Sequence, residues 1–360
     1  MNNVTCNNSL DQQYKKLLAD ILNNGVEKDT RNGKTLSVFG RQIRHKMSEG
    51  FSIITTKKMY FNGVLTELFW FLQGNTNIKY LLKNKCNIWL GDAYKAFLSK
   101  NVSSTLSIED FSEKILADDE FAKKWGELGP IYGKQWRNWF HGNWWFNGSR
   151  PMVTAEYTDQ IQNVINELRN NPDSRKMVVS AWNAGEISDM VLEPCHYSFQ
   201  LYTRELNLNE RRILGYDYIN PMEWDIHVHN NEDVEKICNK YNVPKKAISF
   251  MWNQRSVDTP LGLPFNISSY GLLLNIFAKM ANMVPDELIG NLGDCHIYVN
   301  QIDGIKEQLT RSGYKLPTLN ISNNINFSGN IDDMLNSCKL TDFTLENYKY
   351  NEAIKMPLSN

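Results

Sequence analysis

The chain has 360 residues and a formal net charge of -1, with 39 lysines and arginines against 40 aspartates and glutamates. Its 42% of hydrophobic and 22% of charged residues are typical of a folded protein and exclude a disordered or collagen-like chain. Because the charges nearly cancel, the composition also excludes general electrostatic binding to nucleic acid or to an anionic membrane.

Cysteine spacing and the lack of long apolar runs indicate the cellular compartment in which the protein is expected. The six cysteines form no Cys-x-x-Cys pair and fit neither a disulfide framework nor a zinc ribbon. The opening MNNVTCNNSLDQQYKK lacks the apolar core of a signal peptide, and no later run of about 18 residues is uncharged and apolar. We therefore expect a protein of the reducing cytoplasm that does not bind membranes.

Two helices are predicted in the first quarter of the chain. Residues 10–24 repeat apolar side chains at helical spacing and stop at Gly25, a residue type that commonly ends helices. Residues 64–72 are apolar nearly all round, which predicts a buried helix whose only acid is Glu67. A further helix is expected to begin near residue 75.

Two polar segments are predicted as surface insertions in a compact fold. In residues 91–126, the sequence SIEDFSEKILADDEFAKKW opens with Ser107 and Asp110 at capping-box spacing and predicts one surface helix. Residues 204–245 are polar and mixed, and they separate two strand-like runs. Between the two insertions, residues 158–170 show an amphipathic helical pattern.

The remaining sequence predicts strands and two more helices. Runs rich in β-branched or aromatic side chains predict strands at residues 177–182, 197–202 and 247–252. Long helices are predicted at residues 267–283 and 299–310, and the last fifty residues alternate short strands with turns. No linker or repeat divides the sequence, so we expect a single α+β domain over residues 1–360.

Cys195, in Glu-Pro-Cys-His at the start of a predicted strand, is the first candidate for chemistry. A cysteine is a useful nucleophile when a cation or hydrogen-bond donors stabilise its thiolate, and otherwise it is a small buried apolar residue. His196 cannot readily serve as its base in a Cys-His hydrolase, because adjacent strand residues point to opposite faces. From these residues alone, Cys195 is either a nucleophile or a core residue.

Two basic clusters could bind a phosphorylated ligand. Arg255, between Gln254 and Ser256, offers a planar fork with a neighbouring amide and hydroxyl, which suits a phosphate dianion. An isolated arginine of this kind is more often a surface residue. Arg175 and Lys176 precede a predicted strand and form either a second phosphate clamp or a solvated turn.

Three further patterns have more than one interpretation. Asn266 could present a donor and an acceptor to a ligand, or cap a helix. His296 and Tyr298 would share one face of a strand and could bind a sugar hydroxyl together, or the histidine could belong to the core. The pair His227 and His229 has the same spacing but no third ligand, so no metal site is predicted.

The order of ten sequence blocks resembles the thymidylate synthase family from near residue 10 to near the C-terminus. The blocks are TLSVFG (35–40), TTKK (55–58), ELFWFLQGNTNI (67–78), IW (88–89), LGPIYGKQWR (128–137), DQIQNVI (159–165), NPDSRKMVVSAWN (171–183), EPCHYSFQLY (193–202), QRSVDTPLGLPFNISSY (254–270) and GDCHIYVN (293–300). The resemblance implies the thymidylate synthase fold, an α+β fold with a large mixed β-sheet flanked by helices and, here, two surface insertions.

The resemblance also implies a reaction. Members of this family transfer a one-carbon unit from 5,10-methylenetetrahydrofolate to C5 of a pyrimidine nucleoside monophosphate, and no metal is implied. Cys195 is expected to attack C6 of the base, while Arg255 binds phosphate and favours the thiolate. Glu67, Tyr132 and His196 are expected to form a proton-transfer network.

The binding residues follow from the same resemblance. The family is expected to form a homodimer with shared active sites. Four phosphate-binding residues are expected from one protomer, namely Arg31, Gln254, Arg255 and Ser256. The other two, Arg175 and Lys176, are expected from its partner. The ribose is expected on His296 and Tyr298. Folate is expected on five residues, of which Asp258 is also assigned to catalysis: Lys57, Ile88, Trp89, Asp258 and Gly262. Because Asn266 suits the uracil edge, where cytosine-specific relatives carry Asp, dUMP is the expected substrate.

Several residues depart from the family pattern. Lys176 stands where arginine is usual, Leu90 where an acid is usual and Gln301 where histidine is usual, and the sequence ends in the polar Ser359-Asn360. Such changes favour access of water to the C5 methylene, which would then be hydrated instead of reduced. We therefore expect a dUMP hydroxymethylase of the bacteriophage type, acting in the host cytoplasm and making 5-hydroxymethyl-dUMP.

Two alternatives remain. The first is an ordinary thymidylate synthase, which makes dTMP and dihydrofolate, and the presence of Trp89 and Tyr132 favours it. The second is an inactive nucleotide-binding protein, which the joint presence of Cys195, Glu67 and Arg255 disfavours. Specific nucleic-acid binding is expected of none of them.

Overall fold

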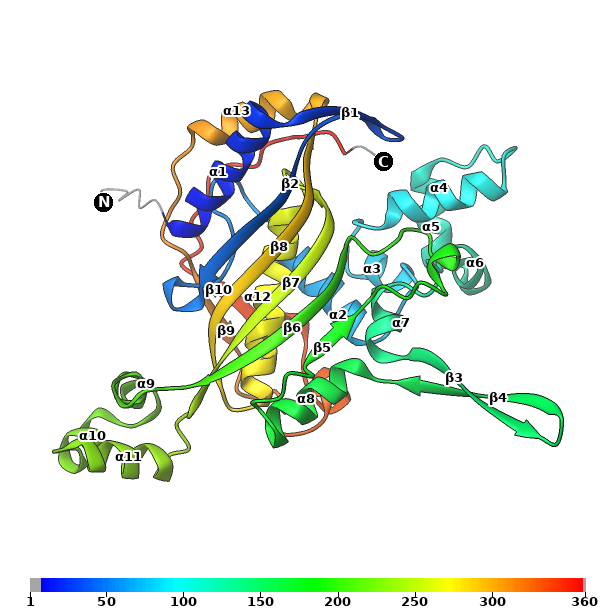
Figure 1. The fold of residues 1–360 in the computed structure, drawn as a ribbon. Helices are drawn as coiled ribbons and strands as arrows, with labels where there is room; N and C mark the ends of the chain where they lie inside the picture. The colour runs from blue at the N-terminus through cyan, green and yellow to red at the C-terminus, as the bar shows by residue number, and fades with distance from the viewer. Residues whose placement is uncertain (1–7, 359–360) are drawn as a thin grey trace.

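The computed structural model describes residues 8–358, and its frame is one six-stranded β-sheet (Figure 1). The strand order is β1-β2-β8-β7-β6-β5, and all neighbours are antiparallel except β7 and β8, which are parallel. The strands are β1 Val26–Thr30, β2 Gly33–Lys46, β5 Val178–Ser180, β6 His196–Glu205, β7 Lys246–Asp258 and β8 Val284–Tyr298. The expected large mixed sheet is confirmed.

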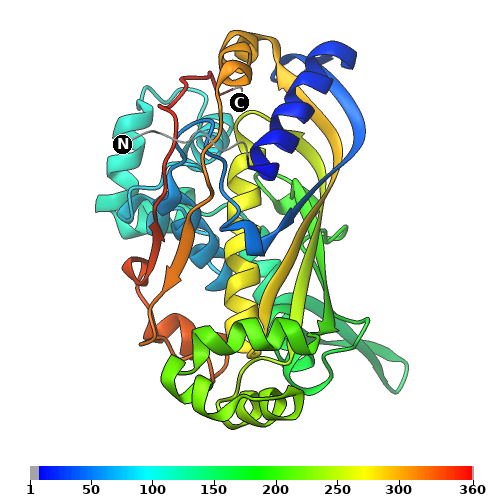
Figure 2. The same cartoon turned by 90° about the vertical axis from the view of Figure 1, so that its left-hand side faces the viewer.

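Helices cover one face of this sheet. Helix α12 (Gly262–Met280) packs on β7 and β8 and against α2 (Phe61–Leu72), and α1 (Ser9–Asn24) packs on β2. Figure 2 shows these helices on the same side, and no helix of the described residues covers the opposite face of the sheet, which we call the uncovered face. No helix within residues 8–358 has both the length and the apolar character needed to cross a membrane.

Shorter elements complete the domain. The remaining core helices are α3 Lys79–Lys83, α7 Tyr132–Arg137, α8 Gln160–Asn170, α13 Ile302–Thr310 and α14 Ile331–Ser337. Single 3-10 turns occur at η1 Met47–Glu49, η2 Ile187–Asp189, η3 Val299–Gln301 and η4 Leu340–Asp342. A separate two-stranded sheet pairs β9 (Thr318–Ile321) with β10 (Phe343–Glu346).

The helices with clear periodicity lie where they were predicted, with informative differences at their ends. Gly25 does end α1, but in an extended conformation, and glycine is needed there because a Cβ would lie 2.3 Å from the carbonyl oxygen of Ile21. Helix α12 begins at Gly262, before the predicted start at residue 267. Asn266 therefore lies inside the helix, which excludes the interpretation that it is only an N-cap. Helix α3 begins at Lys79, after its predicted start.

The first polar segment forms three helices where one surface helix was predicted. They are α4 Leu90–Lys100, α5 Ile108–Ala117 and α6 Asp119–Trp125, and the predicted capping box of Ser107 and Asp110 is confirmed at α5. The surface assignment is wrong in part, because Phe97, Phe111 and Ile115 are buried in the main core. That the segment is an insertion stays a prediction.

The second polar segment folds around its own small core. Three helices follow β6: α9 Leu208–Tyr218, α10 Pro221–His227 and α11 Asn231–Lys240. Their buried side chains, separate from the main core, are Ile219, Trp224, Val234, Ile237, Cys238 and Val243. The Trp224 ring lies against Gly215, where a Cβ would come within 2.0 Å of it. This close packing ties α9 to α10.

A β-hairpin that was not predicted extends from the domain. It consists of β3 (Trp139–Asn147) and β4 (Arg150–Thr158), which pair only with each other in the sheets of the described chain. Figure 1 shows the hairpin projecting beyond the end of β5, away from the helices α9–α11.

Replacing Trp224 by alanine should loosen the α9–α11 unit without loosening the main sheet. Removing a buried Trp side chain typically costs about 3 to 5 kcal/mol, and here the loss falls on a core that is not shared. Hydrogen exchange should show faster exchange of amides in α9 and α11, and unchanged protection in β6–β8. The exposed neighbour Met222→Ala is the control. Faster exchange throughout the chain would contradict a separate core.

Candidate active site

The ends of β7 and β8, the β1–β2 turn and Cys195 before β6 meet at one edge of the sheet and line a cavity of about 690 Å³. Because β7 and β8 are parallel, their carboxyl ends reach the same edge, and Asp258 pairs with His296 there. Cys195 directly precedes β6, which is antiparallel to β7, and the β1–β2 turn reaches the edge because Thr35 pairs with Tyr298. The predicted residues that line this cavity are Arg31, Cys195, Arg255, Ser256, Asp258, His296 and Tyr298.

Arg255 is held against the backbone that carries Cys195. Its Nε donates to the carbonyl of Pro194 at 3.0 Å, and its Nη2 donates to the carbonyl of Glu193 at 3.0 Å. The backbone N-H of Arg255 also donates to the carbonyl of Cys195 at 2.8 Å. The guanidinium lies over the Trp182 ring, 5.3 Å from its centroid. Arg255 thus fixes the loop of the candidate nucleophile as well as facing the cavity.

The charge around the Cys195 thiol is mixed. Burial raises the pKa of the Cys195 thiol, and Arg255 lowers it, while Asp92, Glu193 and Asp258 raise it further. The net direction is upward. Arg255 does lower the pKa of the Cys195 thiol, as expected of a residue that favours the thiolate. In the free chain, however, burial and the three carboxylates raise this pKa by more than Arg255 lowers it.

Glu67 lies behind the cavity in a dry environment. The indole Nε1 of Trp89 donates to Glu67 Oε1 at 2.8 Å, and both side chains are buried. Burial raises the pKa of Glu67 to about 7, and the bond from Trp89 only partly opposes this. A carboxyl group that titrates near neutrality can both accept and release a proton.

Tyr132 and His196 connect this buried layer to Cys195. The phenol oxygen of Tyr132 accepts from the Cys195 backbone N-H at 2.7 Å, and the Tyr132 ring stacks on His196 with centroids 4.2 Å apart. The Nδ1 of His196 and the hydroxyl of Tyr270 are hydrogen-bonded at 2.6 Å. Burial lowers the pKa of His196 to about 3, so its imidazole is neutral near pH 7. Tyr270 was not predicted.

Three of the predicted folate residues, Lys57, Asp258 and Gly262, lie where β7 passes into α12. Asp258 Oδ1 accepts from the backbone N-H of Leu261 at 3.1 Å, and Lys57 Nζ donates to the carbonyl of Pro260 at 2.5 Å. Burial raises the pKa of Asp258 and lowers the pKa of Lys57 to about 8, and each charge partly opposes the effect of burial on the other. Gly262 begins α12 at this point. Ile88 is half exposed beside the buried Trp89.

Gln254 and Asn266 contact each other behind the cavity. Gln254 is buried, and its amide donates to Asn266 Oδ1 at 3.1 Å and to the Ser256 carbonyl at 3.1 Å. Trp252 Nε1 donates to Gln254 Oε1 at 3.2 Å. Gln254 does not line the cavity with Arg255, so its contact with phosphate stays a prediction. Its observed contacts orient the Asn266 amide.

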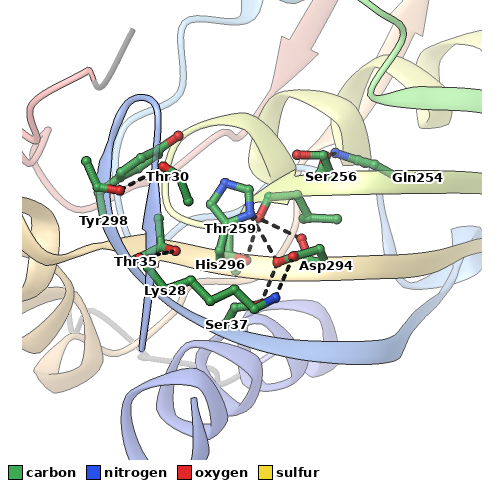
Figure 3. Close-up of polar contacts among 12 residues, drawn as sticks. Lys28, Thr30, Thr35, Ser37, Gln254, Ser256, Thr259, Asp294, His296 and Tyr298 are labelled. Atoms are coloured by element: carbon green, nitrogen blue, oxygen red, sulfur yellow. Dashed lines mark hydrogen bonds and ion pairs between the residues drawn. The ribbon is translucent and has the colours of Figure 1, made fainter. Parts of the chain in front are cut away.

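Residues that were not predicted surround His296 (Figure 3). Asp294 Oδ1 lies 3.6 Å from His296 Nδ1, and Asp294 also accepts from Ser37 at 2.5 Å and from Lys28 at 3.0 Å. Asn32 hydrogen-bonds to Tyr298, yet its buried Oδ1 has no partner among the residues described. Asn32 sits between the predicted Arg31 and the TLSVFG block, and this neighbourhood is the only sequence signal that could have identified it.

One wall of the cavity comes from the first polar segment. Asp92, Lys95 and Ser99 of α4 line it, and burial raises the pKa of Asp92 while Lys95 and Arg31 lower it. These residues recur every three or four positions after Trp89, so a helical projection of the segment would have placed them on one face. Treating the segment as surface concealed them.

Arg175 and Lys176 do not reach the cavity of their own chain. Both are exposed in the turn before β5, and neither lines the cavity. Their predicted contact with phosphate therefore depends on a second copy. Among residues 8–358, no three His, Cys, Asp or Glu side chains are grouped to hold a metal ion.

Replacing Glu67 by glutamine should remove a pH dependence of stability. With its pKa raised to about 7, the folded chain binds a proton that the unfolded chain releases above about 4.5. The free energy of unfolding should therefore fall as pH rises between these values, by about 1.4 kcal/mol per pH unit at most. The glutamine amide would keep an acceptor for Trp89 but cannot titrate.

Urea unfolding of both proteins between pH 5 and 8 measures this difference. The wild type should lose stability relative to Glu67→Gln up to about pH 7, and the difference should then level off. Glu113→Gln, on the exposed surface of α5, is the control and should follow the wild type. Parallel curves for wild type and Glu67→Gln would show that Glu67 is not perturbed.

Comparison with known proteins identifies the family. A family model described as thymidylate synthase matches residues 12–360. The thymidylate synthase of Mycoplasma mobile is 40% identical over 345 residues, covering 96% of this chain and 98% of that protein. The thymidylate synthase of Malacoplasma penetrans is 38% identical, covering 96% of this chain and 98% of its own length. That of Staphylococcus haemolyticus is 36% identical, covering 98% of this chain and 99% of its own length.

These relatives overturn the expected dUMP hydroxymethylase, because all of them are thymidylate synthases, and they give no support to a bacteriophage source. Two of the departures behind that expectation have structural roles. Leu90 packs against the main core, and Gln301 donates to the carbonyl of Pro357 at 3.0 Å. The polar Ser359-Asn360 lies outside the described residues. The chain belongs to the thymidylate synthase family and is one of its transferases.

Proposed function

We propose that this chain converts dUMP to dTMP, with 5,10-methylenetetrahydrofolate becoming dihydrofolate. The near full-length similarity to thymidylate synthases supports the reaction class. The observation that carries the proposal is the buried contact between Trp89 and Glu67, because it keeps an indole ring and a carboxyl group with a pKa raised to about 7 in the buried layer behind Cys195. Both features exclude water from the place where the C5 methylene would form.

The donor set suits the two ligands. Arg31, Arg255 and Ser256 face the cavity together and can bind a phosphate dianion, and His296 and Tyr298 lie at the β8 end for the ribose. Methylenetetrahydrofolate, when bound, supplies both the one-carbon unit and the hydride. Lys57, Ile88, Trp89, Asp258 and Gly262 are the residues that would hold it, at the start of α4 and of α12.

Cys195 is the proposed nucleophile. The Tyr132 phenol accepts from the backbone N-H of Cys195, and the Arg255 backbone N-H donates to its carbonyl. These two bonds fix the direction of the Cys195 side chain. Because the thiol pKa is raised in the free chain, attack on C6 requires a proton acceptor or a change of charge on substrate binding. The carboxylates that raise this pKa, Asp92, Glu193 and Asp258, are groups through which this proton can leave.

The buried layer is the proposed proton relay. Glu67, with a pKa of about 7, can protonate and deprotonate the base as charge develops on it. The neutral His196 and Tyr270 are hydrogen-bonded to each other, and Tyr132 lies between them and Cys195. In this arrangement, protons can move without leaving a net charge in the dry layer.

We further propose a homodimer with shared active sites, formed through the uncovered face of the sheet. A row of side-chain hydrogen bonds crosses this face, from Gln42 to Asn291, Asn253 and Ser198. Tyr197 and Tyr202, both exposed, lie on β6. Arg175 and Lys176, which do not line the cavity of their own chain, would supply phosphate contacts to the partner.

The reaction is tested by incubating enzyme with dUMP and methylenetetrahydrofolate and identifying both products by mass spectrometry. The proposal expects dTMP with stoichiometric dihydrofolate, seen also as an absorbance change. Cys195→Ala should form no product but keep most of its dUMP binding. A nucleotide heavier than dUMP by CH2O would overturn the proposal, and dUMP binding without any product would indicate an inactive nucleotide-binding protein.

Replacing Asn266 by aspartate should shift the base preference from dUMP toward dCMP. Gln254 can still donate to the carboxylate, but the amide donor that Asn266 offers to uracil is lost. A mispaired buried polar group costs about 1 to 3 kcal/mol, so the ratio of kcat/KM values should change by roughly 5- to 150-fold. Steady-state kinetics with both nucleotides measure it, with Asn275→Asp in the same helix as control. An unchanged ratio would assign base recognition elsewhere.

A further inference from the structure

One face of the β3–β4 hairpin consists entirely of apolar residues. Directly opposed residues of an antiparallel pair share a face. On the first face the opposed pairs are Phe140 with Tyr157, Gly142 with Ala155, Trp144 with Val153, and Phe146 with Pro151. On the second face they are Trp139 with Thr158, His141 with Glu156, Asn143 with Thr154, Trp145 with Met152, and Asn147 with Arg150. We call the first set the apolar face and the second the polar face.

The polar face satisfies its own groups, as a solvent-facing surface does. Asn143 donates to Glu156 at 3.3 Å, Trp145 Nε1 donates to Thr154 at 3.1 Å, and His141 lies 3.9 Å from Glu156. The second face also carries Trp139, Trp145 and Met152, but only the first face lacks charged side chains and hydrogen-bonded side-chain pairs. A ribbon with one such face typically packs on a partner with its apolar side.

Nothing within residues 8–358 covers the apolar face. Its side chains belong neither to the main core nor to the α9–α11 core, and both strands pair only with each other. Trp144 and Phe146 are each 71% exposed, and Val153 is 52% exposed. A two-stranded hairpin is at best marginally stable in water, and an exposed contiguous apolar surface marks an interaction site.

Position and charge identify the partner as a second copy of this chain. Figures 1 and 2 show the hairpin projecting from the β5 end of the sheet, toward the side of the uncovered face. If a second copy docks on the uncovered face by two-fold symmetry, each copy presents the same surface to the other, and that surface includes the hairpin. With nine residues in each strand, the hairpin reaches roughly 30 Å. The formal net charge of -1 gives two copies little reason to repel.

We propose that the β3–β4 hairpin is a docking arm whose apolar face packs on a second copy of this chain. The arm rests on the proposed homodimer and adds to it a contact outside the sheet face. It buries the aromatic side chains in the assembly and leaves the polar face in solvent. A different partner protein is the competing outcome.

The first test compares the two faces of the ribbon. Trp144→Ser/Phe146→Ser removes the apolar face, and Trp145→Ser/Met152→Ser removes similar bulk from the polar face. Sedimentation velocity over a dilution series should show the dimer dissociation constant raised tenfold or more for the first variant and changed less than about twofold for the second. Circular dichroism and hydrogen exchange of β6–β8 verify that both variants are folded. Equal dissociation constants for wild type and the apolar-face variant overturn the arm.

The second test needs no loss of stability. Benzoylphenylalanine is placed at position 146, and isotopically labelled and unlabelled protomers are mixed before irradiation. The arm predicts cross-links between labelled and unlabelled chains. Dimers without such cross-links, or a wild type that stays monomeric at micromolar concentration, overturn it in favour of another partner.

Turnover separates this proposal from the proposed function. The apolar-face variant should retain wild-type kcat at concentrations above its dimer dissociation constant, because the hairpin does not line the cavity. Full dTMP formation with unchanged dimerisation would overturn the arm alone. Absence of dTMP formation by the wild type would overturn the proposed function, and the sedimentation and cross-linking results would still decide on the arm.

Discussion

The parallel pairing of β7 and β8 is the constraint on which the candidate site depends. It is the one parallel pair among the described strands of the sheet, and a parallel pair needs a crossover connection, here α12. The crossover makes α12 begin at the same edge where β7 ends, so Asp258, Gly262 and Asn266 are close in space as well as in sequence. It also returns the chain so that β8 ends beside β7, which brings His296 to Asp258. An antiparallel β8 would place the ribose residues at the opposite end of the sheet.

Around this edge, the side chains form two layers that differ in charge. The outer layer lines the cavity and carries ions, with Arg255 against Glu193 and Lys28 against Asp294. The inner layer is buried, and burial favours the neutral form of each of its groups. It raises the pKa of Glu67 to about 7 and lowers the pKa of His196 to about 3. Binding and proton transfer are thus separated by dielectric environment.

The sequence was sufficient to predict elements whose side chains show a strong period. Helix α1 differs from its predicted bounds by a single residue, because one face of it is apolar throughout. The hairpin was missed although Gly148-Ser149, which follows an aromatic run and forms its two-residue turn, is a recognised turn signal. Both of its faces are exposed, so its sequence lacks the alternation of core and solvent residues that marks a half-buried strand.

The sequence predicted which residues belong to the candidate site more successfully than it predicted which residues they contact. Gln254 is buried although Ser256 and Asp258, which have the same parity on β7, line the cavity. Strand alternation therefore predicts neither the burial of Gln254 nor its contact with Asn266, which depends on where α12 packs. A helical projection groups Asp92, Lys95 and Ser99 on one face of α4, but the approach of this face to Arg31 depends on the packing of distant segments.

The position of β2 in the sheet has a consequence during translation. Strand β2 lies between β1 and β8, and Gln42 bonds to Asn291, which is 249 residues later in the chain. At translation rates of about 5 to 20 residues per second, roughly 10 to 50 seconds pass between the synthesis of β2 and that of β8. During this time the edge of β2 that β8 will occupy has no partner strand, and an unpaired strand edge is a template for pairing with other chains. That edge is therefore a place where chaperone binding during synthesis would raise the yield of folded protein.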